Sequence, residues 1–194
     1  PQGMMDNVKK YRTELIEKAV ESDEKLMEKY LNGQELTVAE LKSAIRKSTI
    51  NPDTHFYPVL GGDFRGISAQ QILDAVVDYF PSPLEVLPAT GVDRKTGETH
   101  LCKPDNSEPF RALAFKIITD PYVGRLVYFR VYSGTIDAGS YINNTTQNIK
   151  ERLGRVVLLH ADQREEIKHV FAGEIAAAVG LKDTKTGDTL TKEG

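Results

Sequence analysis

The stretch that decides the fold is ALAFKIITDPYVGRLVYFRVYS, residues 112–133. Its two halves, 112–118 and 126–133, are rich in branched and aromatic residues, which favour strands. Asp120-Pro121 between them is a turn signal. The stretch therefore predicts two neighbouring β-strands.

The same pattern of short apolar runs between turn signals continues to the C-terminus. Further strands are predicted at 140–143, 152–160 and 175–181, with turns such as Asp137-Ala138-Gly139 between them. Several strands within roughly 110 residues indicate a small closed barrel, because an open sheet of that length would leave exposed edges.

Before this region, the sequence is mainly helical. Between residues 11 and 31 the apolar residues recur at spacings of three and four, which predicts an amphipathic helix. Ser22-Asp23 is also suited to cap a second helix, so one helix or two helices with a break both remain open. Thr37 and Glu40 have the spacing of a capping box and predict a helix to about residue 47.

The last part of the helical region leads to a domain boundary. Residues 55–60 are short, apolar and aromatic and predict a strand. Ser68 and Gln71 predict a second capping box and a helix to about residue 79, which Pro81-Ser82-Pro83 ends. We therefore expect an α+β chain with a helical part at 1–83 and a β-barrel at 84–194.

Composition limits the classes of function. The 194 residues carry 25 Lys and Arg against 28 Asp and Glu, a net charge of −3, so any nucleic-acid site must be a local patch. Cys102 is the single cysteine and the four histidines have no metal-ligand spacing, so we expect no metal site. Without a signal or membrane pattern, we expect a cytoplasmic monomer with no membrane or DNA partner.

Charge is unevenly distributed along the chain. Residues 1–80 have a net charge of −3, and residues 111–168 one of +3. If 11–31 is one helix, its glutamates fall on the face opposite the apolar stripe, where they are either a solvated surface or a binding surface. These glutamates are Glu14, Glu17, Glu21, Glu24 and Glu28. No catalytic constellation and no phosphate-binding Gly-x-x-x-x-Gly-Lys-Ser/Thr loop occurs, which favours a binding module.

Longer stretches carry a family resemblance. The first is LDAVVDYFPSP, residues 73–83. The second consists of ALAFKI (112–117), DPYVGRL (120–126) and FRVYSG (129–134). The third is AGEIAAAVGLKDT (172–184), followed by TGDTL (186–190). Together they resemble bacterial elongation factor G over nearly the whole chain.

The resemblance implies a middle slice of that family. The slice would run from inside the helical G′ insertion, through the last strand and helix of the P-loop GTPase domain, to the end of the translation-factor β-barrel, domain II. The parent would use GTP and Mg²⁺ to drive movement of tRNA and mRNA. The phosphate loop and the Asn-Lys-x-Asp motif lie before the slice, so this chain alone is expected to bind no cofactor and not to hydrolyse GTP.

The resemblance also assigns candidate site residues. It implies a remnant of the last guanine-contacting loop at Gly62, Asp63, Phe64 and Arg65, which lack the family's Ser-Ala pair. The five glutamates match the helix that contacts the C-terminal domain of the ribosomal stalk protein. Candidate contacts to small-subunit ribosomal RNA are Arg125, Arg130, Arg152, Arg155 and Arg164.

Two other interpretations remain open. One is a related translational GTPase of the ribosome-protection or release-factor type, which shares the barrel, although the run from Ile175 to Thr184 favours elongation factor G. The other is a standalone barrel that binds RNA or the ribosome. The start at Pro1 leads us to expect a piece of a longer protein instead.

Overall fold

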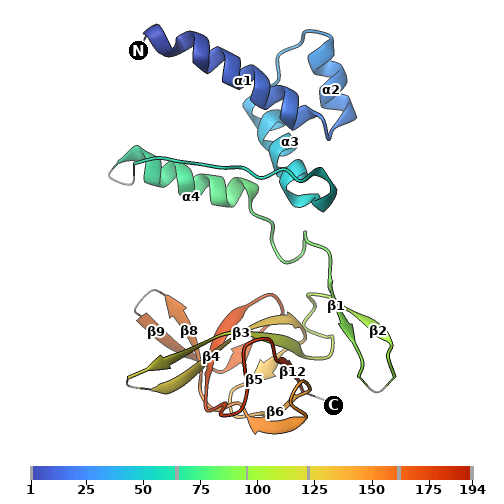
Figure 1. Ribbon diagram of the computed structural model, residues 1–194, viewed down its shortest axis with the longest axis vertical. Coiled ribbons are helices and arrows are strands. Elements are labelled where there is room, and N and C mark those ends of the chain that lie inside the picture. Colours follow the sequence, from blue (N-terminus) through green and yellow to red (C-terminus); the bar gives the residue numbers. More distant parts are fainter. Residues whose placement is uncertain (1, 64–65, 95, 122, 161–162, 193–194) are drawn as a thin grey trace. The chain divides into compact units, whose positions relative to one another are not determined.

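The computed structural model describes residues 2–63, 66–94, 96–121, 123–160 and 163–192. The chain divides into two compact units, Pro1–Val86 and Leu87–Gly194. The described part of the first unit is helical and that of the second is built from strands, and each has its own core (Figure 1). None of the helices in these described ranges is both long enough and apolar enough to span a membrane.

Four α-helices build the first unit. They are α1 (Met5–Val20), α2 (Glu24–Leu31), α3 (Val38–Ile50) and α4 (Ile67–Tyr79), with 3₁₀ turns at Gln2–Met4 and Pro52–Thr54. The core lies where α1 meets α3: Ala19 and Ala44 are completely buried and Leu41 and Ile45 nearly so. Much of α4 has no apolar partner, since Leu73 is 68% and Val77 78% exposed.

The predicted helix over 11–31 is two helices. Asp23 has an extended backbone, and its carboxylate accepts hydrogen bonds from Leu26 N (3.3 Å) and from the Lys47 ammonium (2.5 Å). These bonds lower the pKa of Asp23, that from Lys47 contributing most. An N-cap aspartate starts a new helix, so the alternative with a break is confirmed.

The remaining predictions for this unit had mixed outcomes. The capping box of Thr37 and Glu40 is confirmed at the start of α3. The capping box at Ser68 is wrong, because Gly66 holds the N-cap position and Ser68 lies inside α4. The strand at 55–60 is also wrong: this segment has no regular structure. A strand needs a neighbour to bond, and the described part of this unit contains only helices.

Antiparallel strands make up the second unit. An eight-stranded sheet has the order β7-β6-β12-β3-β4-β11-β8-β9, and two-stranded sheets pair β1 with β2 and β10 with β5. The strands are β1 (Ala89–Val92), β2 (Thr99–Cys102), β3 (Arg111–Asp120), β4 (Gly124–Ser133), β5 (Ile136–Asp137), β6 (Tyr141–Asn144), β7 (Ile149–Arg152), β8 (Val156–His160), β9 (Gln163–Ile167), β10 (His169–Val170), β11 (Ile175–Val179) and β12 (Thr189–Thr191).

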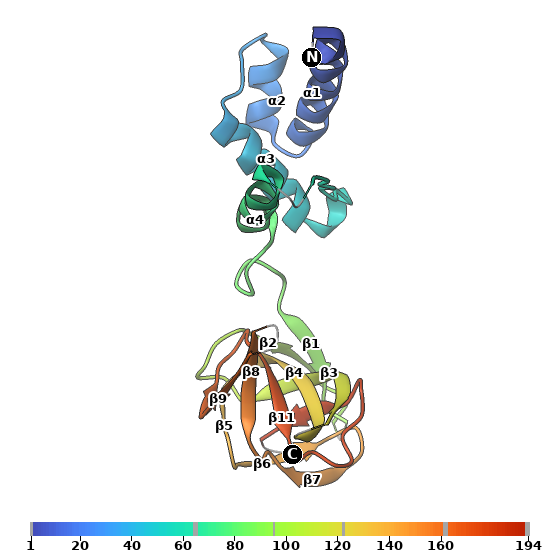
Figure 2. The same ribbon diagram turned by 90° about the vertical axis from the view of Figure 1, so that its left-hand side faces the viewer.

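The large sheet curls around its core into a barrel (Figure 2). The edge strand β9 is followed almost at once by β10, which pairs with β5 in the small sheet. After β5, Leu153 N donates to Ser140 O (2.8 Å) and Gly139 N to Leu153 O (2.7 Å), which ties the chain back to the end of β7. Phe129, Val131 and Val156 lie at the centre and are fully buried.

The strand predicted at 152–160 is wrong as a single element. It is broken at residues 153–155, between β7 and β8. At Gly154 the backbone passes so close to β11 that a Cβ would lie 2.4 Å from Val179 O. Only glycine fits such an approach, and this contact between distant segments turns the chain from one strand into the next.

A buried polar network fixes the loop before β12. The Asp188 carboxylate, 2% exposed, accepts hydrogen bonds from Asn144 Nδ2 (2.7 Å), Lys185 N (2.7 Å) and Gln147 Nε2 (3.2 Å). The Glu151 carboxylate, which points inward from β7, accepts from Lys182 N (2.7 Å) and from the Thr184 hydroxyl (2.5 Å). Two buried carboxylates therefore hold one loop.

Candidate nucleic-acid and protein interfaces

The five candidate glutamates are all exposed, but they do not share one helix. Glu14 and Glu17 lie on α1, Glu21 follows its last turn, and Glu24 and Glu28 lie on α2. The continuous acidic ridge expected from one long helix is therefore wrong. The break at Asp23 divides it into two acidic segments on neighbouring helices, each still open to solvent.

Three of these glutamates have partners inside the unit. Glu17 accepts a hydrogen bond from the Tyr30 hydroxyl (3.0 Å), which links α1 to α2 and raises the pKa of Tyr30. Glu21 pairs with Lys18 at 2.8 Å, and Glu14 lies 3.9 Å from Lys10. Among the described contacts, Glu24 and Glu28 have no side-chain partner, so α2 carries the more available carboxylates.

The structure describes the expected guanine-loop remnant only in part. Phe64 and Arg65 lie outside the described residues, and Gly62 and Asp63 are exposed and without regular structure. A Cβ at Gly62 would lie 2.7 Å from the Cβ of Ser68, so packing against α4 requires a glycine there. None of Gly61, Gly62 and Gly66 has a positive φ angle, so no left-handed backbone requires a glycine at these positions.

Two of the five candidate arginines are engaged in the fold. The Arg125 guanidinium donates to the backbone oxygens of Lys182 and Thr184, so it holds the loop that Glu151 also holds. Arg164 on β9 forms an ion pair with Asp120 at the end of β3. Both bonds satisfy the guanidinium locally, which leaves it less free for a phosphate.

The other three arginines are more open. Arg152 and Arg155 are exposed, and Arg152 Nε donates to Gly139 O (3.2 Å). Arg130 on β4 is partly exposed, with its guanidinium carbon 5.8 Å from the centre of the Tyr132 ring. The structure thus separates the predicted set into two structural arginines and three that a partner can reach.

Strand alternation brings Arg130 and Arg152 onto one surface of the barrel. Ile142, Leu190, Ala112 and Val131 are buried in the core, so the alternate residues of their strands point away from it. We call this surface the outer face. It consists of Lys150 and Arg152 on β7, Tyr141 and Asn143 on β6, Thr189 and Thr191 on β12, Arg111 and Leu113 on β3, and Tyr128, Arg130 and Tyr132 on β4.

The outer face gathers positive charge without carboxylates. Both acidic residues of these five strands, Glu151 and Asp120, are buried. Arg111, Lys150, Tyr132 and Tyr141 were missing from the predicted site. The alternating sequence of 149–152 would have revealed Lys150 beside Arg152, had this segment been assigned as a strand of its own.

Comparisons with known proteins agree with this architecture. The family model for elongation factor G domain 2 matches residues 109–193, which begin just before β3 and include β12. A crystal structure of a protein from Thermus thermophilus is similar to the whole chain, with 25% sequence identity and a TM-score of 0.67. The match covers 100% of this chain and 26% of that one, so this chain spans about a quarter of its length.

The family match coincides with the large sheet of the barrel. It covers all strands of the eight-stranded sheet, including the β3 and β4 pair that the stretch 112–133 predicts. The structural match extends over the helical unit as well, and the family model confirms the resemblance to elongation factor G over the barrel. The β-barrel, residues 109–193, is therefore similar to domain 2 of elongation factor G.

Proposed function

We propose that this chain binds the ribosome, as part of a factor that uses GTP to move tRNA and mRNA during elongation. The observation that carries the proposal is the match of residues 109–193 to the elongation factor G domain 2 family. The barrel would supply contacts to small-subunit ribosomal RNA and the acidic helices contacts to the stalk protein. Arg130, Arg152 and Arg155 are the best placed for RNA, since none forms an ion pair in the described contacts.

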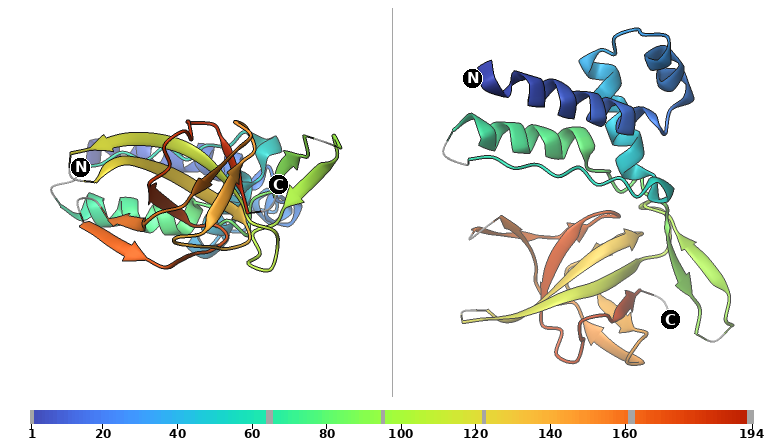
Figure 3. Two further views of the ribbon diagram at one scale, coloured as in Figure 1. Left: turned by 90° about the horizontal axis from the view of Figure 1, so that it is seen from below. Right: turned by 45° about the horizontal axis from the view of Figure 1, so that its top comes forward.

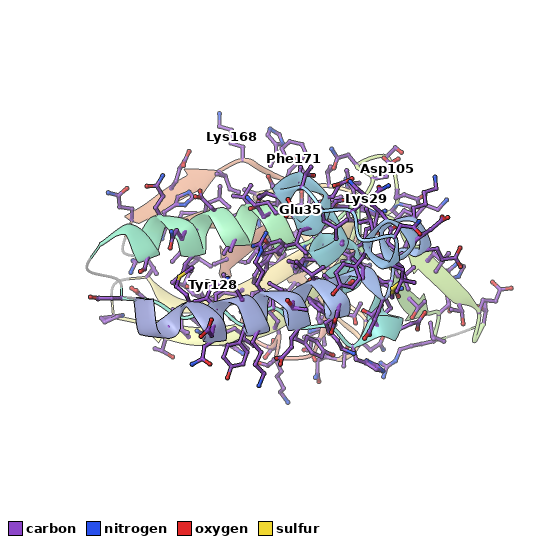
Figure 4. All side chains as sticks on the ribbon, turned by 90° about the horizontal axis from the view of Figure 1, so that it is seen from above. Lys29, Glu35, Asp105, Tyr128, Lys168 and Phe171 are labelled. Atoms are coloured by element: carbon purple, nitrogen blue, oxygen red, sulfur yellow. The ribbon has the colours of Figure 1, made fainter. Side chains whose placement is uncertain are left out.

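For the stalk contact we propose α2 as the main contributor. Glu24 and Glu28 are exposed, and an ion pair of Lys29 with Glu40 at 2.7 Å ties α2 to α3 (Lys29 is labelled in Figure 4). Carboxylates presented on an ordered helix attract a basic partner surface and set its orientation.

We further propose that the chain by itself does not hydrolyse GTP. Its sequence has no Gly-x-x-x-x-Gly-Lys-Ser/Thr loop to hold phosphates. The close contact of Gly62 with Ser68 explains that glycine by packing alone. GTP and Mg²⁺ would therefore act through parts of the parent factor other than this one.

Sedimentation with purified small ribosomal subunits tests the RNA contact. We expect binding that weakens steeply with salt, and replacing Arg130, Arg152 and Arg155 by alanine should lower the salt slope by about 1 for each phosphate that is no longer neutralised. Arg164→Ala is the matched control, because this arginine pairs with Asp120. An equal decrease in binding for the control and the triple variant, or binding insensitive to salt, would contradict the proposal.

Titration with the isolated C-terminal domain of the stalk protein tests the second contact. The double variant Glu24→Gln, Glu28→Gln should weaken binding. The control variant Glu35→Gln should not, because Glu35 is an exposed glutamate between α2 and α3. If both changes act equally, only overall charge matters and the assignment to α2 is wrong.

A further inference from the structure

The outer face combines charge and aromatic rings in a way that the family match does not explain. Four cationic residues point from it, namely Arg111, Arg130, Lys150 and Arg152. The two carboxylates of the same strands are turned inward or into an ion pair. The charged side chains of these strands that point from this face are therefore all cationic, although the chain as a whole carries a net charge of −3.

Aromatic rings lie among these cations. Tyr141 is 59% exposed, with the Lys150 ammonium 5.0 Å from its ring centre, and Arg130 lies at 5.8 Å from the ring of Tyr132. Next to them, Tyr128 and Phe115 form a tilted pair with ring centres 6.3 Å apart (Tyr128 is labelled in Figure 4). Each tyrosine of the two cationic pairs thus presents a ring beside a positive charge.

The two pairs are separated by a polar stretch. From Tyr141 on β6 to Arg130 on β4 the sheet crosses β12 and β3, and three strand spacings amount to about 14 Å. Asn143, Thr191 and Arg111 lie between them in one cross-strand row. Among the described residues, Arg111 Nη1 and Thr191 Oγ1 are buried and have no hydrogen-bond partner, so these two atoms lie beneath the surface of the row and are not offered to a ligand.

We propose that the outer face binds unpaired RNA, with a base stacking on Tyr141, a second base near Tyr132, and the four cations on the connecting phosphates. Aromatic rings interleaved with cations suit single strands, because every base offers a flat face for stacking while the backbone needs positive charge. A duplex hides its bases and would use the cations alone. The inference rests on the proposed ribosome binding and names the kind of RNA that this face contacts.

Fluorescence anisotropy with labelled 12-nucleotide oligouridine, compared with a 12-base-pair RNA duplex, tests this mode with the whole chain. We expect the single strand to bind more tightly. Tyr141→Ala should weaken single-strand binding about fivefold or more and leave duplex binding unchanged, since stacking is removed and charge is kept. Tyr141→Phe, which keeps the ring, should restore binding.

Two exposed residues outside the face provide matched controls. Tyr57→Ala removes a 78% exposed tyrosine of the helical unit, and Lys168→Ala removes an exposed lysine of the barrel that lies between β9 and β10. Both should stay within about twofold of the unchanged chain, whereas Lys150→Ala should weaken single strand and duplex alike. Unchanged amide spectra of β3 and β4 would establish that each variant is folded.

The outcomes separate this inference from the proposed function. If Tyr141→Ala and Tyr57→Ala behave alike, or the duplex binds as well as the single strand, stacking is refuted while sedimentation with small subunits can still succeed. If neither RNA binds but Lys150→Ala weakens sedimentation, the face contacts a ribosomal protein and the inference is wrong. If sedimentation fails in the unchanged chain, the proposed function itself fails.

Discussion

Removing the Asp188 carboxylate should destabilise the barrel selectively. Asp188→Ala deletes an acceptor that is 2% exposed and receives two hydrogen bonds of 2.7 Å, from Asn144 Nδ2 and Lys185 N. A hydrogen bond to a charged group contributes about 1.5–3 kcal/mol, and removal also relieves the cost of burying the charge. Taking the lower end for both bonds, we expect a loss of about 3 kcal/mol in the free energy of unfolding.

Urea unfolding followed by the amide signals of β3 and β4 reports the barrel separately from the helices. The midpoint should fall with little change in the slope. Asp183→Ala is the matched control: it removes a carboxylate of the same loop whose described contact is made by its backbone N alone, and should cost below about 0.5 kcal/mol. Equal effects of the two changes, or a loss under about 1 kcal/mol for Asp188→Ala, would refute the reasoning.

The effect should also depend on pH in a defined direction. Burial opposes ionisation of Asp188 and is the largest single effect, but the bonds from Asn144, Lys185 N and Gln147 together outweigh it and lower the pKa below its usual 3.8. A lowered pKa stabilises the folded state above the usual pKa, and this contribution is lost as the pH falls through the folded value. The difference between the unchanged chain and Asp188→Ala should therefore be full at pH 7 and shrink below about pH 4.

Two other changes test the cores and caps. Phe129→Ala empties a site at the centre of the barrel, where the ring is 0% exposed, and should cost about 3–5 kcal/mol in the same urea assay, with Phe115→Ala, 40% exposed, costing less. Thr37→Ala removes the oxygen that accepts from Glu40 N (3.2 Å) and should lower the stability of α3 by about 1 kcal/mol, seen as faster hydrogen exchange in its first turn; unchanged exchange there would contradict the capping role.

Local sequence patterns predicted the elements that are stabilised locally. The runs that form β3 and β4 alternate around a turn signal, and the Thr37 and Glu40 capping box is made within four residues. Segment 55–60 has equally good strand composition, but a strand forms only where a neighbour completes its hydrogen bonds. The sequence of the segment does not show whether a neighbouring strand is available.

The predictions that failed concern features that depend on contacts between distant segments. The break at Gly154 depends on Val179 O, and the start of α2 depends on Asp23, which also bonds Lys47. The site was affected in the same way: Arg125 and Arg164 look like surface cations in the sequence, yet they bind Thr184 O and Asp120. Only the strand order placed Arg130 and Arg152 on one face with Tyr141.

The inward orientation of Glu151 and Asp188 has a practical consequence for purification (Figure 3 shows the barrel from two further directions). With a pI of about 5.9, the chain should be retained by an anion exchanger at neutral pH. The carboxylates that the barrel turns into its interior cannot repel an anionic ligand by direct contact at the outer face, so the same chain should also be retained on heparin. Retention on both resins would show that strand alternation places the cations outside and these carboxylates inside, a separation that the net charge of the chain does not reveal.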